Sequence, residues 1–477
     1  MILNISGEKR KLDIKEKKTI LQILQDEGIY LSATCGGRGV CRKCKIKVLA
    51  GNLEVTEKDE KYFSKEELLD GYRLACTAYP QENLEICIES SEKEYSILNE
   101  FKDKINNINH GYKTIQVNLK DLDWEKNNSF YSAIKANLNL NFNLNSPYTL
   151  SPKALKAMSK ILTTCKHGES LLLIKDKKIT DMFCHESYNI YGIAIDIGTT
   201  TLGFSLIDLQ SGNIKGKYSK LNSQGIYGAD IISRIQHAAS GKLEELQDRI
   251  KIDIVTAIRE LLQSNGIDNR FIYEIAISGN TAMLHLLLGL YPELLGRSPF
   301  VAVNLDLIEL RFFEVFGVDL LDCRVTILPG MGVFVGADVM AGILYHDMFK
   351  AEKINLFIDI GTNGEIVIAN KNFILATATA AGPALEGGNI SCGIGSVMGA
   401  IARVSYDGNS FEWETIGNKE PIGICGSGVI DIIGQGLKYG LIDNTGLLRE
   451  DLIEKGLIIY TDKKGKKLAL KQKDIRQ

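Results

Sequence analysis

Two segments of this chain repeat one another, and the repeat limits the folds that its C-terminal half can adopt. Residues 191–208 read YGIAIDIGTTTLGFSLID, and residues 354–370 read INLFIDIGTNGEIVIAN. Each segment has an apolar strand that ends in Asp, then an Ile-Gly-Thr turn, then a second apolar strand. A duplication on this scale predicts two related lobes rather than a solenoid.

The two turns have the composition of phosphate-binding loops. Glycine lets the backbone approach a phosphate, Thr hydroxyls and N–H groups can donate to its oxygens, and Asp can hold a hydrated Mg²⁺. An ordinary hairpin turn would explain one copy but is a weak explanation for two. We therefore expect a phosphate clamp formed by Asp196, Gly198, Thr199, Thr200, Asp359, Gly361, Thr362 and Asn363.

Further glycine-rich loops lie between and after the two turns. In the last of them, Gly426, Ser427 and Gly428 precede an apolar helical pattern, which suits a backbone turn beneath a nucleotide base or ribose. The sequence GxxxxGK[ST] does not occur, so P-loop chemistry is excluded. These loops occupy residues 277–289, 333–342, 379–395 and 421–437.

Four cysteines near the N-terminus have the spacing of an iron–sulfur site. Cys35, Cys41 and Cys44 lie in a loop with three glycines, and Cys76 follows well downstream. Three close thiolates and one distant thiolate are typical of a [2Fe–2S] cluster, although the first gap is one residue longer than in plant-type ferredoxins. A zinc knuckle would need paired CxxC motifs, and only Cys41 and Cys44 form one.

The segments around these cysteines predict a small α+β domain. Two alternating strands flank a polar turn at residues 7–9, Thr19 and Gly28 bound an amphipathic helix, and KIKVLAG resumes as a strand. This order resembles a β-grasp ferredoxin domain, with the longer cysteine gap of the vertebrate type. The resemblance covers about the first 90 residues.

The composition excludes several classes of partner. Lys and Arg number 56 against 59 Asp and Glu, so the chain lacks the basic surface that nucleic-acid binding requires. No apolar run is long enough for a membrane span, and the opening residues lack the apolar core of a signal peptide. We therefore expect a cytoplasmic protein without disulfides, whose other cysteines are scattered.

The segment between these two parts carries no recognisable chemistry. Residues 112–189 alternate strand-like pieces with a helix that Ser151 caps and Pro152 opens. Residues 137–145 alternate Asn with Leu or Phe like a strand, yet they follow a helical pattern, so their structure is left open. The six histidines are dispersed and are expected to be structural.

The later motifs resemble those of the superfamily that includes sugar and acetate kinases, actin and the heat-shock chaperone ATPases. Residues 196–201 match its first phosphate motif, 359–365 its second and 423–431 its adenosine motif. More narrowly, the order of ferredoxin, middle segment, DIGTTT, SGNTAMLHLLLG, VGAD, DIGTNGE, AAGPALEGGNI and GICGSG resembles the ATP-dependent reductive activators of corrinoid proteins.

This resemblance implies a multidomain α+β and α/β fold. A β-grasp ferredoxin would occupy residues 1–92, a linker 93–111, a small α/β middle domain 112–189, and a two-lobed, duplicated actin-like, ribonuclease-H-like ATPase domain 190–477. Family members continue beyond the point where this sequence stops, so the nucleotide domain is expected to be incomplete at its C-terminal end.

The resemblance also implies the activity. One electron would pass from a [2Fe–2S] cluster to Co(II) of a corrinoid protein, either a corrinoid/iron–sulfur protein or a methyltransferase corrinoid subunit, and ATP would drive the transfer. The clamp would hold Mg-ATP, Gly426–Gly428 its adenosine, and Glu365 and Glu386 the attacking water. An upstream low-potential donor is expected, and a homodimer is left as an option.

Two alternative functions are open. One is a small-molecule kinase with a redox-sensing ferredoxin domain, which would need a catalytic carboxylate in the cleft and no protein partner. The other is an electron-transfer adaptor without ATPase activity.

Overall fold

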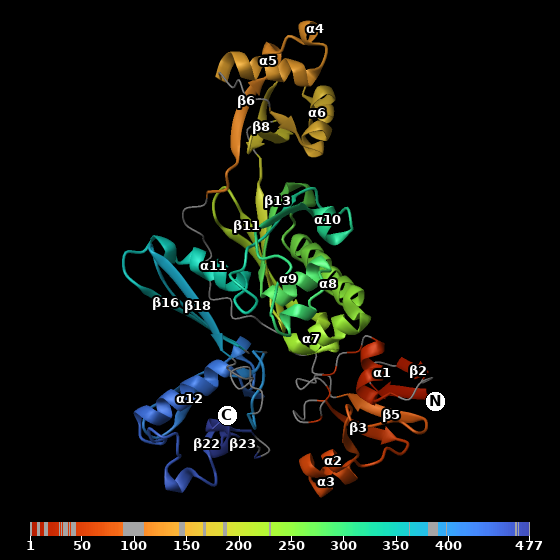
Figure 1. Ribbon diagram of the computed structural model, residues 1–477, viewed down its shortest axis with the longest axis vertical. Helices are drawn as coiled ribbons and strands as arrows, with labels where there is room; N and C mark the ends of the chain where they lie inside the picture. The colour runs from red at the N-terminus through yellow and green to blue at the C-terminus, as the bar shows by residue number, and fades with distance from the viewer. Residues whose placement is uncertain are drawn as a thin grey trace.

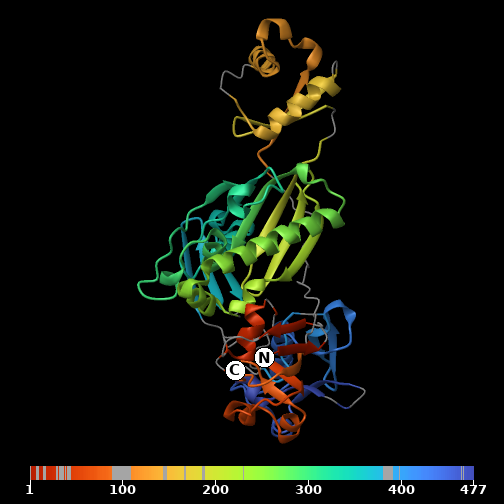
Figure 2. The same cartoon turned by 90° about the vertical axis from the view of Figure 1, so that its right-hand side faces the viewer.

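The computed structural model is elongated and built from several separate sheets (Figure 1). The middle domain lies at one end, and the N-terminal domain and the C-terminal segment lie at the other (Figures 1 and 2). Among the residues described, no helix is both long and apolar enough to cross a bilayer. The structure describes residues 2–6, 10–13, 18–27, 29, 31, 37, 39, 44–88, 109–142, 148–165, 168–184, 188–228, 230–361, 363–379, 390–396, 398–462, 465 and 467–476.

The N-terminal domain is a five-stranded sheet in the order β2-β1-β5-β3-β4, with helix α1 packed on it. The expected hairpin and helix are confirmed: β1 pairs antiparallel with β2, and Thr19 Oγ1 accepts from Gln22 N at 3.2 Å to cap α1. Gly28 lies outside the described residues. The elements are β1 (Ile2–Ser6), β2 (Arg10–Asp13), α1 (Ile20–Asp26), β3 (Lys45–Ala50), α2 (Glu57–Tyr62), α3 (Lys65–Leu69), β4 (Tyr72–Leu74) and β5 (Leu84–Ile88).

The middle domain has a four-stranded sheet in the order β6-β8-β9-β7. Ser151 caps α6 as expected, because its Oγ accepts from Ala154 N at 2.9 Å. The segment left open is helical as far as Phe142, while residues 143–147 are not described. The elements are β6 (Lys113–Asn118), α4 (Trp124–Asn127), α5 (Phe130–Phe142), β7 (Thr149–Leu150), α6 (Pro152–Thr164), β8 (Glu169–Lys175) and β9 (Lys178–Phe183).

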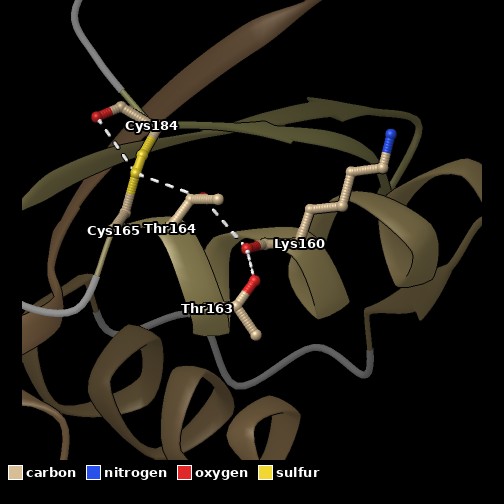
Figure 3. The surroundings of a disulfide bond; sticks show 5 residues. All are labelled: Lys160, Thr163, Thr164, Cys165 and Cys184. Carbon is tan, nitrogen blue, oxygen red and sulfur yellow. Dashed lines mark hydrogen bonds between the residues drawn. A yellow bond between two sulfur atoms is a disulfide. The ribbon is translucent and has the colours of Figure 1, made fainter.

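The structure places Cys165 and Cys184 side by side as a cysteine pair in this domain (Figure 3), whereas the sequence predicted only scattered cysteines without disulfides. Cys165 ends α6 and Cys184 follows β9, and their Cα atoms are 6.1 Å apart. The antiparallel return of β8 and β9 beside α6 brings together two residues that are 19 positions apart. A sequence pattern does not show this proximity.

The first lobe of the C-terminal half is a six-stranded sheet in the order β12-β11-β10-β13-β15-β14. The long amphipathic helix α8 packs along one face of this sheet, and its buried side chains belong to the largest apolar core (Figure 2). The elements are β10 (Tyr191–Ile197), β11 (Thr201–Asp208), β12 (Ile214–Leu221), α7 (Ile231–His237), α8 (Leu243–Ser264), β13 (Ile272–Gly279), α9 (Thr281–Leu288), β14 (Ile308–Arg311), α10 (Phe312–Phe316), β15 (Arg324–Ile327) and α11 (Ala337–Tyr345).

The second lobe begins with a three-stranded sheet in the order β16-β17-β18. Hairpin β16–β17 repeats hairpin β10–β11, which confirms the strand–turn–strand duplication. A second small sheet, β20-β19-β21, packs against α12. The elements are β16 (Asn355–Ile360), β17 (Gly364–Asn370), β18 (Phe373–Thr379), β19 (Ala400–Tyr406), β20 (Phe411–Thr415), β21 (Gly423–Ile424), α12 (Gly426–Lys438), β22 (Leu457–Thr461), β23 (Lys467–Leu470) and α13 (Gln472–Ile475).

Candidate functional site

Carboxylates lie near the turns of the repeated hairpins in both lobes. Asp196 comes near the end of β10, and Asp359 and Glu365 are directly opposed on β16 and β17. Burial, together with the charges of Asp338 and Asp359, raises the pKa of Asp196 to about 6. Asp359 lies on the other lobe, so charges from both repeated hairpins act on Asp196.

Asp196 is exposed to solvent, although the surrounding protein desolvates its carboxylate. Ser278 at the end of β13 donates to Asp196 Oδ1 at 3.2 Å, which favours the ionised form. The neighbouring strand thus orients the carboxylate.

Glu365 is also partly desolvated. Burial, together with the charges of Asp359 and Asp338, raises its pKa to about 7. Burial likewise raises the pKa of Asp338, at the start of α11, with a further contribution from Asp359. Binding a cation or taking up a proton reduces the electrostatic repulsion between crowded, partly desolvated carboxylates of this kind.

Asp338 was not among the residues expected at the site. The sequence marks the VGAD segment as a glycine loop and as part of the family order, but no spacing rule links Asp338 to the repeated turns. The fold makes the link: a Cβ on Gly336 would lie 2.6 Å from Asn280 Cα, so α11 starts in contact with the end of β13. That close approach brings Asp338 to the carboxylates of both hairpins.

The two turns are tightly closed. Gly198 N donates to Thr201 O at 3.0 Å, and Gly361 N donates to Asn363 O at 2.9 Å. A Cβ on Gly198 would lie 2.6 Å from Thr201 O, so this position requires glycine. Asn280, which caps α9, donates from Nδ2 to Thr199 Oγ1 at 3.2 Å. Thr362 and Glu386 lie outside the described residues.

Magnesium would fit the carboxylate group through water. Within the part of the chain that the structure describes, no three His, Cys, Asp or Glu side chains are arranged to ligate a metal directly. Mg²⁺ commonly keeps several waters and takes only one or two carboxylates, with phosphates supplying other ligands. Asp196 and Asp359 therefore suit a hydrated ion held beside phosphates.

The expected adenosine residues lie at the start of α12 and contact β19. Ser427 Oγ donates to Ala402 O at 2.8 Å, and a Cβ on Gly428 would lie 2.4 Å from Ile401 O. Gly426 is the first residue of the helix. Ser427 and Gly428 thus have packing roles that hold with or without a nucleotide.

The iron–sulfur region is described in part. Cys44 and Cys76 are both buried, and the β3–β4 register brings them close, since Ala75 N donates to Cys44 O at 2.9 Å. Gly39 has φ +71°, and a Cβ there would lie 2.6 Å from Lys58 Cδ. Neighbouring buried thiols beside a glycine with positive φ suit a cluster cradle. Cys35 and Cys41 lie outside the described residues.

Three parts of the chain match models of known families. Residues 3–81 match a family model described as "2Fe-2S iron-sulfur cluster binding domain". Residues 191–351 match "RACo middle region", and residues 353–477 match "C-terminal domain of RACo the ASKHA domain". The "RACo middle region" covers the first lobe, and is distinct from the middle domain formed by β6–β9.

Individual relatives agree with these matches. The "Corrinoid activation enzyme RamQ" of Eubacterium limosum is 29% identical over 91% of this chain and 70% of its own length. The "[Co(II) methylated amine-specific corrinoid protein] reductase" of Methanosarcina barkeri is 26% identical over 53% of this chain and 52% of its own length. A solved "Reductive activator for corrinoid,iron-sulfur protein" superposes on 100% of this chain and 80% of its own, with a TM-score of 0.67 and 27% identity.

Proposed function

Because this chain belongs to the family of ATP-dependent reductive activators of corrinoid proteins, we propose that it returns a corrinoid protein from Co(II) to Co(I). The observation that carries the proposal is the union, in one chain, of a ferredoxin domain and two repeated Asp-containing turns whose carboxylates lie near enough for their charges to interact. The partner is a corrinoid protein, and the cofactors are a [2Fe–2S] cluster, ATP and Mg²⁺.

The ferredoxin domain supplies the electron. A [2Fe–2S] cluster, when bound, carries one electron at a potential of roughly −400 mV in plant-type domains. Cys44 and Cys76 would hold it together with Cys35 and Cys41. Co(II) gains that one electron and becomes Co(I), while the cluster returns to its oxidised form.

The two-lobed domain would supply the free energy for this electron transfer by binding and hydrolysing ATP. Asp196 and Asp359 would hold hydrated Mg²⁺, while Gly198, Thr199, Thr200, Gly361, Thr362 and Asn363 would contact the phosphates. Glu365 and Glu386 would orient the attacking water, and Gly426–Gly428 would lie beneath the adenosine. ATP can shift the equilibrium only through different affinities for two states, so its binding and hydrolysis would change the affinity for the Co(II) partner.

The electron donor, the compartment and the assembly also belong to this proposal. A separate low-potential donor would refill the ferredoxin domain, and the supply of ATP places the reaction in the cytoplasm. A homodimer remains an option for the assembly.

An anaerobic assay tests the proposal. The full chain with reduced cluster is mixed with Mg-ATP and a Co(II) corrinoid protein, and the visible spectrum is followed. We expect Co(I), or methylcobalamin when a methyl donor is present, only with Mg-ATP. No change of the corrinoid spectrum, with cluster and partner intact, would contradict the proposal.

The carboxylates in the cleft also suit a small-molecule kinase, because Glu365 has a pKa of about 7 and could accept a substrate proton. The two functions differ in what consumes ATP. Phosphorylation of a small molecule in the absence of any corrinoid protein would favour the kinase.

A further inference from the structure

The first phosphate turn is anchored through its carbonyl groups. Asn222 holds it on two sides: its Nδ2 donates to Gly198 O at 3.0 Å, and its backbone N donates to Thr200 O at 2.9 Å. The carbonyl between them, Thr199 O, accepts from Arg234 Nη2 at 2.5 Å. Three consecutive carbonyls are therefore bound by two residues of another segment.

Those two residues are deeply buried. Arg234 is 1% exposed and leads the fully buried side chains by size, and Asn222 is 2% exposed. Arg234 Nε donates to Gly228 O at 2.8 Å, which fixes its guanidinium to the segment between Asn222 and α7. Its guanidinium therefore links the phosphate turn, through Thr199 O, to the segment that precedes α7.

The bonds of Asn222 separate into two roles. Its Oδ1 accepts from Gln224 N at 3.0 Å and caps the 3₁₀ helix η2 (Ser223–Tyr227), which is a local structural role. Its Nδ2 reaches Gly198 of the phosphate turn. A substitution can therefore keep the first role and remove the second.

We propose that Arg234 and Asn222 are positioning residues that fix the peptide planes of residues 198–200 for phosphate binding. A peptide whose carbonyl is fixed has a fixed N–H direction as well, because the peptide unit is planar. Hydrogen bonds to these carbonyls fix the directions of the backbone N–H groups before the nucleotide binds. Nucleotide binding then carries no entropy cost for ordering the turn. The inference rests on the proposed binding of Mg-ATP at this turn.

Asn222→Ser is the decisive variant. Serine is a good cap for η2 but cannot reach Gly198 O as the amide does, so the fold is kept and one anchor is lost. We expect the Kd for Mg-ATP, measured by calorimetry on the full chain, to rise about tenfold, which corresponds to ~1.4 kcal/mol. The turn contacts phosphates before and during hydrolysis, so the rise should appear in KM, with kcat changed less than about twofold.

Two further variants complete the experiment. Arg234→Lys keeps the charge but loses the fork that spans Gly228 O and Thr199 O, and should weaken Mg-ATP binding by a similar factor. Gln247→Ala is the matched control, since this amide of α8 donates to Leu287 O and not to the turn. Its Kd should stay within about twofold of the wild-type value.

The outcomes are distinct. If Asn222→Ser and Arg234→Lys, each folded at the assay temperature, bind Mg-ATP like the wild type, the positioning role is wrong. The same conclusion follows if Gln247→Ala weakens binding as much as they do. If the wild type itself binds no Mg-ATP, the proposed function fails first, and the positioning role fails with it.

Discussion

Single side chains decide the chemistry at both candidate sites. At the nucleotide cleft, the strand register opposes Asp359 and Glu365, and Asp338 adds a third charge. At the ferredoxin site, buried Cys44 and Cys76 meet through the β3–β4 register. Each arrangement yields a prediction at the level of one residue.

Glu365 should make the nucleotide-free protein less stable as the pH rises. Its pKa is about 7 in the fold against an ordinary value of 4.5, so the folded chain keeps a proton that the unfolded chain loses. The free energy of unfolding therefore falls between about pH 4.5 and 7. We expect Glu365→Gln to unfold at a higher temperature than the wild type at pH 8, with little difference at pH 4.5.

Thermal unfolding at both pH values measures this effect. Glu412→Gln, at an exposed position of β20, controls for the loss of a surface charge. If both variants show the same rise in unfolding temperature at pH 8, the effect does not come from the raised pKa of Glu365.

Cys76→Ser should abolish the normal [2Fe–2S] electron paramagnetic signal, because a thiolate ligand is lost. Cys87→Ser is the control from the same domain: Cys87 lies on β5, and its Sγ contacts Ile88 O at 3.7 Å. The signal should survive in that variant. A normal signal in Cys76→Ser would overturn the ligand assignment.

At the level of elements, α12 shows how a glycine-rich motif can serve packing. Gly428 faces β19 so closely that a Cβ would lie 2.4 Å from Ile401 O, whereas Gly434 on the same helix is exposed and has nothing within 4 Å. The motif that resembles an adenosine loop is thus also the contact between helix and sheet.

The same substitution at these two glycines should have opposite effects. Gly428→Ala overpacks the contact with β19 and should lower the free energy of unfolding by about 1–3 kcal/mol. Gly434→Ala should raise it by about 0.5–1 kcal/mol, because alanine favours a helix interior. Urea unfolding compares them, and a loss of stability in both would contradict this account of α12.

At the scale of the whole molecule, one carboxylate joins the middle domain to the first lobe. Glu274 on β13 accepts from Tyr112 Oη at 2.6 Å and from Lys175 Nζ at 2.8 Å, both on the middle-domain side. Arg324 on β15 also binds it, through Nε and Nη2 at 3.1 Å each. The far end of β13 carries Ser278, which contacts Asp196.

Glu274→Gln should loosen this junction, with a loss of about 2 kcal/mol, because it weakens several charge-assisted hydrogen bonds of a mostly buried group. Glu309→Gln is the matched control: Glu309 also pairs with Arg324, at 3.1 Å, but its side chain is 48% exposed against 18% for Glu274. The free energy of unfolding of Glu309→Gln should fall by at most about 0.5 kcal/mol. Equal losses in urea unfolding would rule out a special role for Glu274.

The sequence by itself determined the features that depend on local pattern. Residue periodicity and capping residues predicted the N-terminal hairpin, α1 and α6, and the repeat predicted two similar hairpins. The domain boundaries at residues 92, 111 and 189 stay predictions.

Only the tertiary structure decided which distant residues meet. The contact between Gly336 and the end of β13 brings Asp338 to the cleft, and the return of β9 beside α6 pairs Cys165 with Cys184. Arg234 on α7 likewise donates to Thr199 O, which is 35 positions away along the chain. Such contacts depend on side-chain packing and strand register between segments far apart in the chain, which periodicity and local spacing do not specify.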